Sequence, residues 1–305
     1  MHFLLLRLIS GLAACEAEML APDQRPLILV DRGHNNWFWR PDETDPVMHE
    51  YLIKSGFQVQ SNEGAFTRKM LGGVQIVQTG NAFPPGDNED WSQPASSAFS
   101  KGEIKLLQEW VREGGSLLVV VEHMPFPAAY ADLLRAFGVE VSDGFALDGV
   151  KLEDLSEAGV ADAGYLVFHR EDGLLADHPI LNGTSGLEKI DFVTTDVGAA
   201  FRLPEGAVSL VTLGAGSVSL ETRNSWVFDE KTIYREVTCW SQAGIIEYGR
   251  GWVAVLGDSF LFTAPGFIEA PFVEHEKDIQ YGKNNHIFTQ NLIRWLAGIQ
   301  SVRSE

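Results

Sequence analysis

An unbroken apolar run at residues 117–121, with the sequence Leu-Leu-Val-Val-Val, narrows the choice of folds for this chain more than any other segment. The run follows Gly114 and Gly115 and ends abruptly in Glu122 and His123. A continuous run rich in valine is typical of a strand that is buried on both faces, as in parallel sheets covered by helices. In such sheets ligands bind beyond the carboxyl ends of the strands. We therefore expect Glu122 and His123 to lie where a functional site would be.

Strands and helices alternate before and after this run. Short apolar stretches and amphipathic stretches predict strands at residues 26–31, 57–60 and 74–79, and helices at residues 46–55, 101–113 and 128–137. The first helix has Asp45 as a candidate N-cap and Pro46 at its first position. Ser100 and Glu103 match a capping box at the start of the second. This alternation predicts a right-handed parallel α/β sheet.

The carboxyl-terminal part of the chain adds a different signal. Apolar runs at residues 244–248 and 251–256 are joined by a glycine-rich turn, which predicts an antiparallel hairpin. An amphipathic helix is expected at residues 285–297. The predicted fold is therefore α/β: a flavodoxin-like three-layer sandwich, with a mostly parallel sheet, helices on both faces and a C-terminal antiparallel hairpin. It forms a single domain over residues 26–298 with an insertion at about 139–238.

The insertion contains few clear periodic patterns. Residues 178–183 combine His-Pro and Asn-Gly pairs, which predict turns. A β-like run is expected at residues 208–213, and the polar stretch 214–236 is interpreted as a hairpin. The sequence leaves open whether this region is a lid, a second lobe or a surface for a partner.

Residues 1–25 are interpreted as a segment that resembles a lipoprotein signal, followed by a tail. Leu-Ala-Ala precedes Cys15, similar to the lipobox of bacterial lipoproteins, in which the cysteine is lipidated after cleavage. Only seven residues separate Arg7 from Cys15, at the lower limit for the apolar part of a signal peptide. Two interpretations stay open: a lipid-anchored protein of the bacterial cell envelope, or a cytoplasmic protein whose true start is Met19.

The formal net charge of −19 at pH 7 limits the partners of this chain. Nucleic acids and anionic membrane surfaces carry charge of the same sign, so neither is expected to bind. Membrane contact is expected only through the N-terminal lipid anchor. The two cysteines, Cys15 and Cys239, provide neither a disulfide framework nor zinc-finger spacing.

Several segments resemble, in order, a known type of fold. They are the strand ending in Asp31 with His34-Asn35-Asn36, the helix start at Ser100 and Glu103, Gly114-Gly115-Ser116, Gly257-Asp258-Ser259 and the helix at 285–295. Together they resemble the class I glutamine amidotransferase-like folds of bacterial proteins. That group includes a domain-of-unknown-function family often attached to membranes and auxiliary subunits of ABC-type transport and gliding systems. They are also similar to the corresponding domain of an intraflagellar transport subunit.

The chain departs from true amidotransferases at the catalytic position. The resemblance implies a nucleophilic cysteine on the sharp turn after the central strand, but Glu122, His123 and Met124 occupy that turn. No G-x-S-x-G elbow occurs in the sequence. Cys239 is expected inside a strand, where a buried thiol is inert. We therefore do not expect amidotransferase activity, and an enzyme of any kind is the less favoured interpretation.

The candidate ligand-binding residues follow three strand ends and open the last helix. They are Asp31, His34, Asn35, Glu122, His123, Asp258, Ser259 and Asn285. Carboxylates and imidazoles can bind a divalent metal or act as acid and base. The same residue types also stabilise turns in proteins without a site. Three tryptophans in neighbouring loops, Trp37, Trp39 and Trp91, are candidates for contact with a partner or a sugar.

Two hypotheses follow from these residues. The favoured one is a non-catalytic module of the cell envelope that binds an envelope protein or a small polar ligand and has no cofactor. The alternative is a metal-dependent hydrolase in which Asp31, His34, Glu122, His123 and Asp258 surround a divalent ion. That hypothesis requires the five side chains to lie close together, because metal–ligand distances are about 2–2.6 Å.

Overall fold

The main sheet spans the whole molecule. The computed structural model describes residues 24–37, 46–84, 86, 91–149, 166–183, 188–263 and 284–299. Within these residues nine strands form the main sheet: β1 (Leu27–Asp31), β2 (Gln58–Asn62), β3 (Ile76–Gly80), β4 (Ser116–Val120), β5 (Glu140–Val141), β9 (Phe201–Arg202), β10 (Val208–Thr212), β13 (Ser241–Tyr248) and β14 (Gly251–Leu256).

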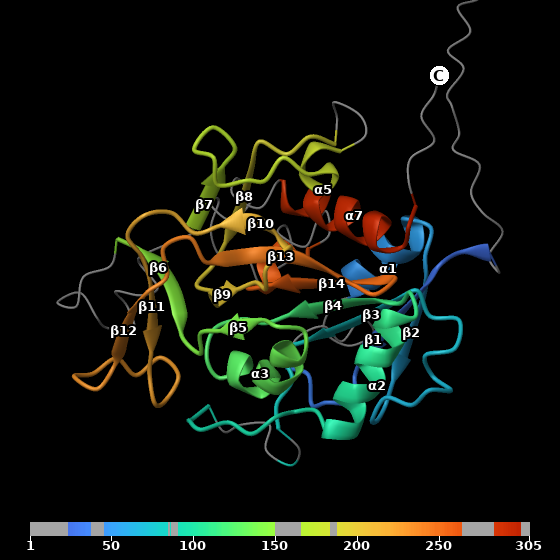
Figure 1. The fold of residues 1–305 in the computed structure, drawn as a ribbon, viewed down its shortest axis with the longest axis horizontal. Helices are drawn as coiled ribbons and strands as arrows, with labels where there is room; N and C mark the ends of the chain where they lie inside the picture. The colour runs from blue at the N-terminus through green and yellow to red at the C-terminus, as the bar shows by residue number, and fades with distance from the viewer. Residues whose placement is uncertain are drawn as a thin grey trace, which may run out of the picture.

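The order of the strands is that of a flavodoxin-like sheet with an antiparallel extension. Strands β2, β1, β3, β4 and β14 lie side by side and are parallel. Strand β13 pairs antiparallel with β14 and leads on to β9 and β5, while β10 also pairs with β13. The predicted parallel sheet and the predicted hairpin are both confirmed (Figure 1).

Helices cover both faces of this sheet. The described helices are α1 (Pro46–Lys54), α2 (Lys101–Arg112), α3 (Phe126–Ala136), the short α5 (Pro179–Asn182), the 3-10 turn η3 (Ser259–Leu261) and α7 (Asn285–Leu296). Helices α2 and α3 lie on one face, and α1, α5 and α7 lie on the other (Figure 1). The protein is thus an α/β three-layer sandwich, as the sequence predicted.

The main sheet has a hydrophobic core on each face, and residues 117–121 lie at the centre of both cores. All five side chains are fully buried. Leu118 and Val120 pack in the core under α1 and α7 with Phe288, whereas Val119 packs in the core under α2 and α3 with Tyr130. The alternation of a strand sends successive side chains to opposite faces, so an all-apolar run fits only where both faces are covered.

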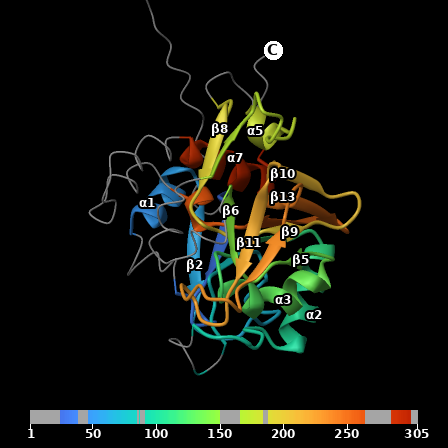
Figure 2. The same ribbon diagram turned by 90° about the vertical axis from the view of Figure 1, so that its left-hand side faces the viewer.

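Of residues 139–238, the described part adds strands to the main sheet and forms two small sheets of its own. Strands β5, β9 and β10 extend the main sheet beyond β13. Two small sheets complete the region, one of β6 (Phe145–Asp148), β11 (Ser217–Glu221) and β12 (Ile233–Glu236), the other of β7 (Leu166–His169) and β8 (Phe192–Thr195). The hairpin predicted for residues 214–236 is confirmed by the antiparallel pairing of β11 with β12. Figure 2 shows β6 and β11 beside each other at the end of the molecule that carries β5 and β9.

Three local expectations differ from the structure. Helix α3 begins at Phe126, two residues earlier than expected, because Pro127 suits a first helical turn. The turn expected at residues 178–183 contains the four-residue helix α5, which the His178 side chain caps by accepting the N–H of Ile180. Strand β6 forms where the alternation of acid and glycine gave no period, because its residues pair with β11, far along the chain.

Some predictions fall on residues that the structure does not describe. Cys15 and Met19 lie outside the described residues, as do Trp39 and the candidate N-cap Asp45. Among the described residues, no helix is long and apolar enough to span a membrane.

Candidate functional site

A cluster of buried polar side chains lies at the carboxyl end of β1, and we call it the β1 cluster. Asp31 is 1% exposed, and its carboxylate accepts a hydrogen bond from His34 Nδ1 at 2.9 Å. Thr79 in β3 and Asn62 at the end of β2 donate to the same carboxylate at 2.7 and 3.1 Å. The backbone N–H of Gly33 donates to it at 3.0 Å. The ends of three neighbouring strands therefore contribute to holding Asp31.

His34 links Asp31 to the start of α2. Its Nε2 atom lies 2.9 Å from Glu103 Oε1, and its ring lies between Phe66 and Phe99. With a carboxylate at each nitrogen, the imidazole donates at both and is held as the imidazolium. Burial alone would lower the pKa of His34, but the hydrogen bonds and charges of Asp31 and Glu103 outweigh it and raise the pKa above its ordinary value.

Glu103 belongs to the β1 cluster, although sequence reasoning assigned it only to a capping box. The capping box is present: the Ser100 side chain accepts the backbone N–H of Glu103, and the Glu103 carboxylate accepts the N–H of Ser100. Its other oxygen accepts His34 and the N–H of Phe66. Burial would raise the pKa of Glu103, but the Ser100 hydrogen bonds and the His34 charge lower it. No sequence signal beyond the capping box pointed to this second role.

The β1 cluster is internally hydrogen-bonded. Asp31, His34 and Glu103 have almost no exposed surface, and their charged atoms are occupied by partners within the chain. A buried charge with a full set of partners ties together the segments that supply them. Here it connects β1, β2, β3 and α2. The prediction that Asp31 and His34 bind a ligand therefore finds no support in their surroundings.

A second polar cluster lies at the carboxyl ends of β4 and β14. Glu122 follows β4, and its carboxylate accepts the hydroxyl of Ser259 in η3. Asp258 is buried, and its two oxygens accept the backbone N–H groups of Asp196 and Phe260, each at 2.6 Å. The structure thus brings together three of the predicted residues, Glu122, Asp258 and Ser259, and adds Asp196 from the end of β8.

Burial governs the ionisation of Asp258. It raises the pKa of this carboxyl well above its ordinary value, and the nearby charges of Glu122 and Asp196 raise it further. The two backbone N–H groups oppose this effect without cancelling it. The folded chain therefore favours the neutral acid at Asp258 more than the unfolded chain does.

Two buried amide groups complete this cluster. Gln78 is 2% exposed and Asn81 is 0% exposed, and within the described chain neither Gln78 Nε2 nor Asn81 Nδ2 has a hydrogen-bond partner. Asn81 Oδ1 accepts the backbone N–H of Glu122 at 3.1 Å, which places the unpaired NH₂ group next to Glu122. We call Gln78, Asn81, Glu122, Asp196, Asp258 and Ser259 the edge cluster.

The position of Gln78 follows from the alternation of β3. Its neighbours Val77 and Thr79 face α2 and α3, so Gln78 faces the other side, as Glu122 does after Val121. Its amide nitrogen lies 3.3 Å from the place that a β-carbon would take at Gly80. The side chain therefore covers the glycine at the end of β3 and carries its amide toward the carboxyl edge.

The remaining predicted residues have other roles. Asn285 is fully buried, and its amide bonds the backbone of Thr194 and Phe260, so its side chain is already occupied at the start of α7. Asn35 donates to the carbonyl of Pro84. His123 belongs to a group of aromatic rings, and burial lowers its pKa. Its ring thus favours the neutral form.

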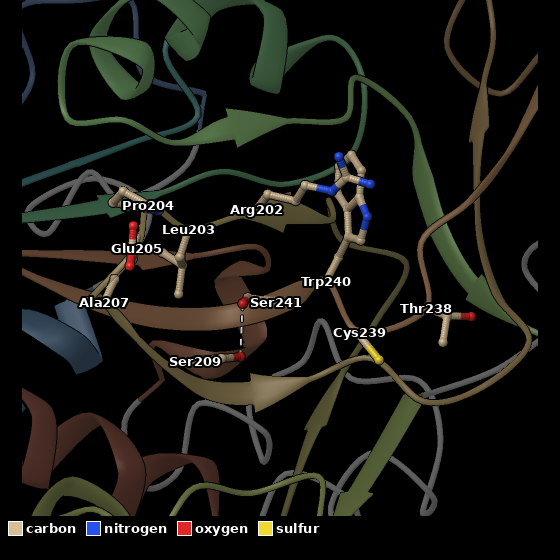
Figure 3. Close-up of a pocket in the computed structure, with 11 residues that line it drawn as sticks. Arg202, Leu203, Pro204, Glu205, Ala207, Ser209, Thr238, Cys239, Trp240 and Ser241 are labelled. Carbon is tan, nitrogen blue, oxygen red and sulfur yellow. Dashed lines mark hydrogen bonds between the residues drawn. The ribbon is translucent and has the colours of Figure 1, made fainter.

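Cys239 lies outside any strand, so the expectation of a buried thiol in a strand is wrong. The thiol is exposed, and the residue has a φ of 65° in the turn between β12 and β13. It lines an open pocket of about 540 Å³ between the β9–β10 turn and the start of β13 (Figure 3). There Arg202 lies over the ring of Trp240, 4.4 Å from its centroid. None of the predicted site residues lines this pocket.

The two clusters do not combine into the predicted metal site. Strand β3 lies between β1 and β4, which separates Asp31 from Glu122 by about 10 Å across the sheet at a strand spacing of ~4.8 Å, and Glu122 also lies further along the strand direction. Asp31 also faces α2 and α3, whereas Glu122 faces the opposite side of the sheet. Among the described residues, no group of three or more His, Cys, Asp or Glu side chains is arranged to hold a metal ion.

These ionisations predict how stability depends on pH. Folding raises the pKa of His34 and Asp258, and burial raises that of Asp143 to about 7. These groups bind more protons in the folded chain than in the unfolded chain, so their contribution to stability is lost as pH rises, that of Asp143 between about pH 4 and 7 and that of His34 above about pH 6.5. Burial lowers the pKa of His123, His178 and His286, so their contribution is instead lost as pH falls below about 6.5. Above about pH 6.5 these three histidines no longer oppose the loss, and we expect the melting temperature to fall as pH rises from there in a calorimetric pH series.

A variant at Asp143 checks this assignment. Asp143→Asn keeps an oxygen to accept the N–H of Ala128 but cannot ionise. Between about pH 4 and 7 the wild type loses the contribution of Asp143, and the variant has no such contribution to lose. We therefore expect the stability of the variant, relative to the wild type, to increase as pH rises over this interval. A constant difference between the two proteins from about pH 4 to 7 would contradict the assignment.

Comparisons with known proteins agree with this architecture. No protein-family model matches the chain, and no curated protein matches it in sequence. Its solved structural neighbours include the mmIFT52 N-terminal domain, with a TM-score of 0.56 at 14% identity, covering 91% of this chain and 99% of that one. A ThuA-like protein from Bacteroides uniformis has a TM-score of 0.45 at 8% identity, with 90% and 92% covered. A GMP synthase component from Thermoplasma acidophilum has a TM-score of 0.41 at 12% identity, with 90% and 98% covered.

These likenesses bear on the fold and not on the activity. The mmIFT52 N-terminal domain shares the fold of this chain, at an identity too low to assign a family. The architecture of this chain is α/β and flavodoxin-like.

Proposed function

We propose that this protein is a non-catalytic binding module whose ligand site is the edge cluster. The ligand is a small polar molecule that carries both hydrogen-bond acceptors and donors. Acceptors on the ligand would meet the amide groups of Gln78 and Asn81. Donors would meet the carboxylate of Glu122, beside the hydroxyl of Ser259. The site lies beyond the carboxyl ends of parallel strands, where ligands bind in open α/β sheets.

The unpaired amide groups of Gln78 and Asn81 carry this proposal. An unsatisfied buried N–H group costs about 1–3 kcal/mol, so buried polar groups in native proteins almost always have a partner. The β1 cluster, on the other face of the sheet, follows that rule. In the edge cluster, by contrast, the amide groups of Gln78 and Asn81 at the end of β3 have no partner within the described chain. A bound ligand would supply the missing acceptors.

Two further features support this position. The hydroxyls of Thr195 and Thr263, which are also buried and unpaired within the described chain, lie at the end of β8 and after η3, next to the same cluster. The described non-glycine residues with positive φ are Asn35, Asn81, Val197, Trp226 and Cys239, and Asn81 and Val197 belong to or adjoin the edge cluster. A β-branched residue such as Val197 at a φ of 56° is strained, and such strain gathers at functional sites.

The chemistry of the edge cluster favours binding over catalysis. The turn after β4 carries Glu122 instead of a thiol or hydroxyl nucleophile, and the Glu122 carboxylate accepts the Ser259 hydroxyl. The neighbouring His123 ring packs against Phe145 and Trp226, and burial lowers its pKa although the Glu122 charge opposes this effect. The arrangement of Asp31 and Glu122 on opposite faces of the sheet does not support the metal-dependent alternative.

A stability measurement tests the unpaired amide directly. Replacing Gln78 by Met keeps the length of the side chain and removes the amide, so we expect the free energy of unfolding to rise by about 1 kcal/mol. Gln108→Met is the matched control, because Gln108 Nε2 donates to the carbonyl of Ala136 at 2.6 Å. That variant should lose stability. If urea denaturation shows Gln78→Met to be as destabilised as the control, the amide has a partner within the chain and the proposal fails.

A ligand screen tests binding. Thermal unfolding of the full chain would be followed with glucose, glucosamine, myo-inositol, lysine and spermidine, which differ in charge and hydroxyl content. A ligand at about 100 times its Kd stabilises by ~2.7 kcal/mol. We expect at least one to raise the melting temperature of the wild type but not of Gln78→Met or Glu122→Gln. No shift with any of them, or equal shifts in all three proteins, would overturn the proposal.

We further propose that the module is anchored in the bacterial cell envelope through a lipid on Cys15. The support is the Leu-Ala-Ala-Cys sequence and the apolar stretch before it. Mass spectrometry of the mature N-terminus, from cells that express the full chain, tests this. A diacylated N-terminal Cys15 is expected, whereas an unmodified chain starting at Met19 would establish the cytoplasmic alternative.

A further inference from the structure

Four partly exposed aromatic rings lie along the carboxyl edge of the sheet, and we call them the ring row. They are Trp37, Trp91, His123 and Trp226. Trp37 follows β1 and is 49% exposed, the others are half-buried, and the row borders the edge cluster. We propose that the ring row binds a neutral oligosaccharide, one end of which reaches the edge cluster. This inference rests on the proposed function and names the class of its ligand.

The rings form a continuous series. The centroid of Trp37 lies 5.4 Å from that of Trp91, which lies 6.3 Å from His123, and His123 lies 5.0 Å from Trp226. The first and last of these pairs meet edge to face, at 90° and 75° between the ring planes, and the middle pair is tilted by 35°, so the row offers edges and faces in turn to a ligand that extends along it. Aromatic side chains are amphipathic surfaces that accept the apolar face of a ligand while its polar groups stay in water.

Buried rings hold this series in place from beneath. Phe83 contacts Trp37 and Trp91, at 6.1 and 5.7 Å between centroids. Phe145 stacks on His123 at 4.7 Å and meets Trp226 at 4.8 Å. Both phenylalanines are almost fully buried. The exposed rings are therefore fixed before binding, which reduces the entropy lost when a ligand docks.

Backbone hydrogen bonds hold the loops that carry the rings. The N–H of Trp37 donates to the carbonyl of Asn81 at 2.8 Å, which joins the ring row to the edge cluster. The N–H of Ser225 donates to the carbonyl of Trp91 at 2.9 Å, and Ser225 Oγ donates to the carbonyl of Met124. Loops far apart in sequence therefore act as one platform.

The surroundings of the ring row favour a saccharide over other ring-bearing ligands. A chain with a net charge of −19 repels nucleic acids, whose bases would otherwise stack on such rings. The hydroxyl groups of a saccharide both donate and accept hydrogen bonds. They can accept from the amides of Gln78 and Asn81 and donate to the carboxylate of Glu122. Aromatic walls with a few converging polar groups are typical of small-molecule sites.

Calorimetric titration of the full chain with four neutral hexasaccharides tests the inference. The probes are maltohexaose, cellohexaose, chitohexaose and laminarihexaose, and a proline-rich decapeptide is titrated in parallel. We expect one hexasaccharide to bind, and both Trp37→Ala and Trp226→Ala to weaken it at least about tenfold, the loss of one stacked ring. Tyr234→Ala removes an exposed aromatic ring on β12, outside the row, and should leave the affinity unchanged.

The outcomes separate this inference from the proposed function. Trp226→Phe keeps a ring and should retain most of the affinity, which guards against a misfolded alanine variant. The inference that the ligand is a saccharide is wrong in any of three cases. No hexasaccharide binds, the tryptophan variants bind the hexasaccharide as tightly as the wild type does, or the decapeptide binds and the hexasaccharides do not. The proposed function still stands in that case if lysine or spermidine binds in a manner that depends on Gln78. It fails together with the inference only if no ligand of either panel depends on the edge cluster.

Discussion

Replacing Asp31 by alanine is expected to cost about 3–5 kcal/mol of the free energy of unfolding, because it removes one partner of a buried ion pair. His34 would keep its charge beside Glu103 but lose the acceptor at Nδ1. The donors of Thr79 and Asn62 would also lose their acceptor. Urea denaturation followed by circular dichroism measures the loss. With typical domain stabilities of about 5–15 kcal/mol, a change of this size would be plain in the unfolding midpoint.

The matched control is Asp132→Ala. Asp132 also pairs with a cation, Arg135 at 2.7 Å, but both side chains are more than half exposed. An exposed pair of this kind contributes about 0–1 kcal/mol. If Asp31→Ala lost no more stability than Asp132→Ala, the β1 cluster would not hold the ends of β1, β2 and β3 to α2.

Replacing Leu118 by alanine is expected to cost about 2–5 kcal/mol, since truncation of a buried leucine loses both its transfer free energy and the contacts around the cavity left behind. Leu118 is fully buried between β3 and β14 at the centre of the sheet. Its side chain packs in the core under α1 and α7. The rigid neighbours of a central strand leave little room for the cavity to collapse, which puts the expected cost in the upper part of that range.

Ile53→Ala provides the comparison for Leu118→Ala. Ile53 lies on α1 and is 40% exposed, so its truncation should change stability by no more than about 1 kcal/mol. Equal effects of the two variants would contradict the central position of β4. An unchanged m-value in both would show that the difference comes from the folded state.

The two polar clusters show what residue type alone leaves open. Asp31 and Asp258 each follow a buried apolar run, and the sequence made them equally good candidates for a site. In the structure Asp31 accepts from β2, from β3 and from the residues that directly follow β1, and its charge raises the pKa of His34. Asp258 has two backbone donors, and burial, together with the charges of nearby carboxylates, raises its pKa. Long-range partners therefore decide how each of the two acids is paired and which form folding favours.

The fold was predictable where its signals are local. The apolar run around Leu118 predicted a strand covered on both faces, because alternate side chains of a strand face opposite layers. Ser100 and Glu103 predicted the start of α2 through hydrogen bonds that span three residues. The hairpin of β13 and β14 followed from two apolar runs and a tight turn. In each case the residues that carry the signal also make the contact.

The sequence by itself determined the layers of this protein, and the tertiary structure alone decided its polar sites. Glu103 meets His34 across 69 positions, and Ser259 meets Glu122 across 137, so no spacing in the chain predicts either contact. The hydrophobic effect that buries apolar residues is non-directional, so the pattern of apolar residues along the chain already indicates which of them are buried. A polar atom is satisfied only by a partner at the right distance and angle, and that partner is supplied by the packing of distant segments. For this reason the unpaired amides of Gln78 and Asn81 emerged only from the folded chain.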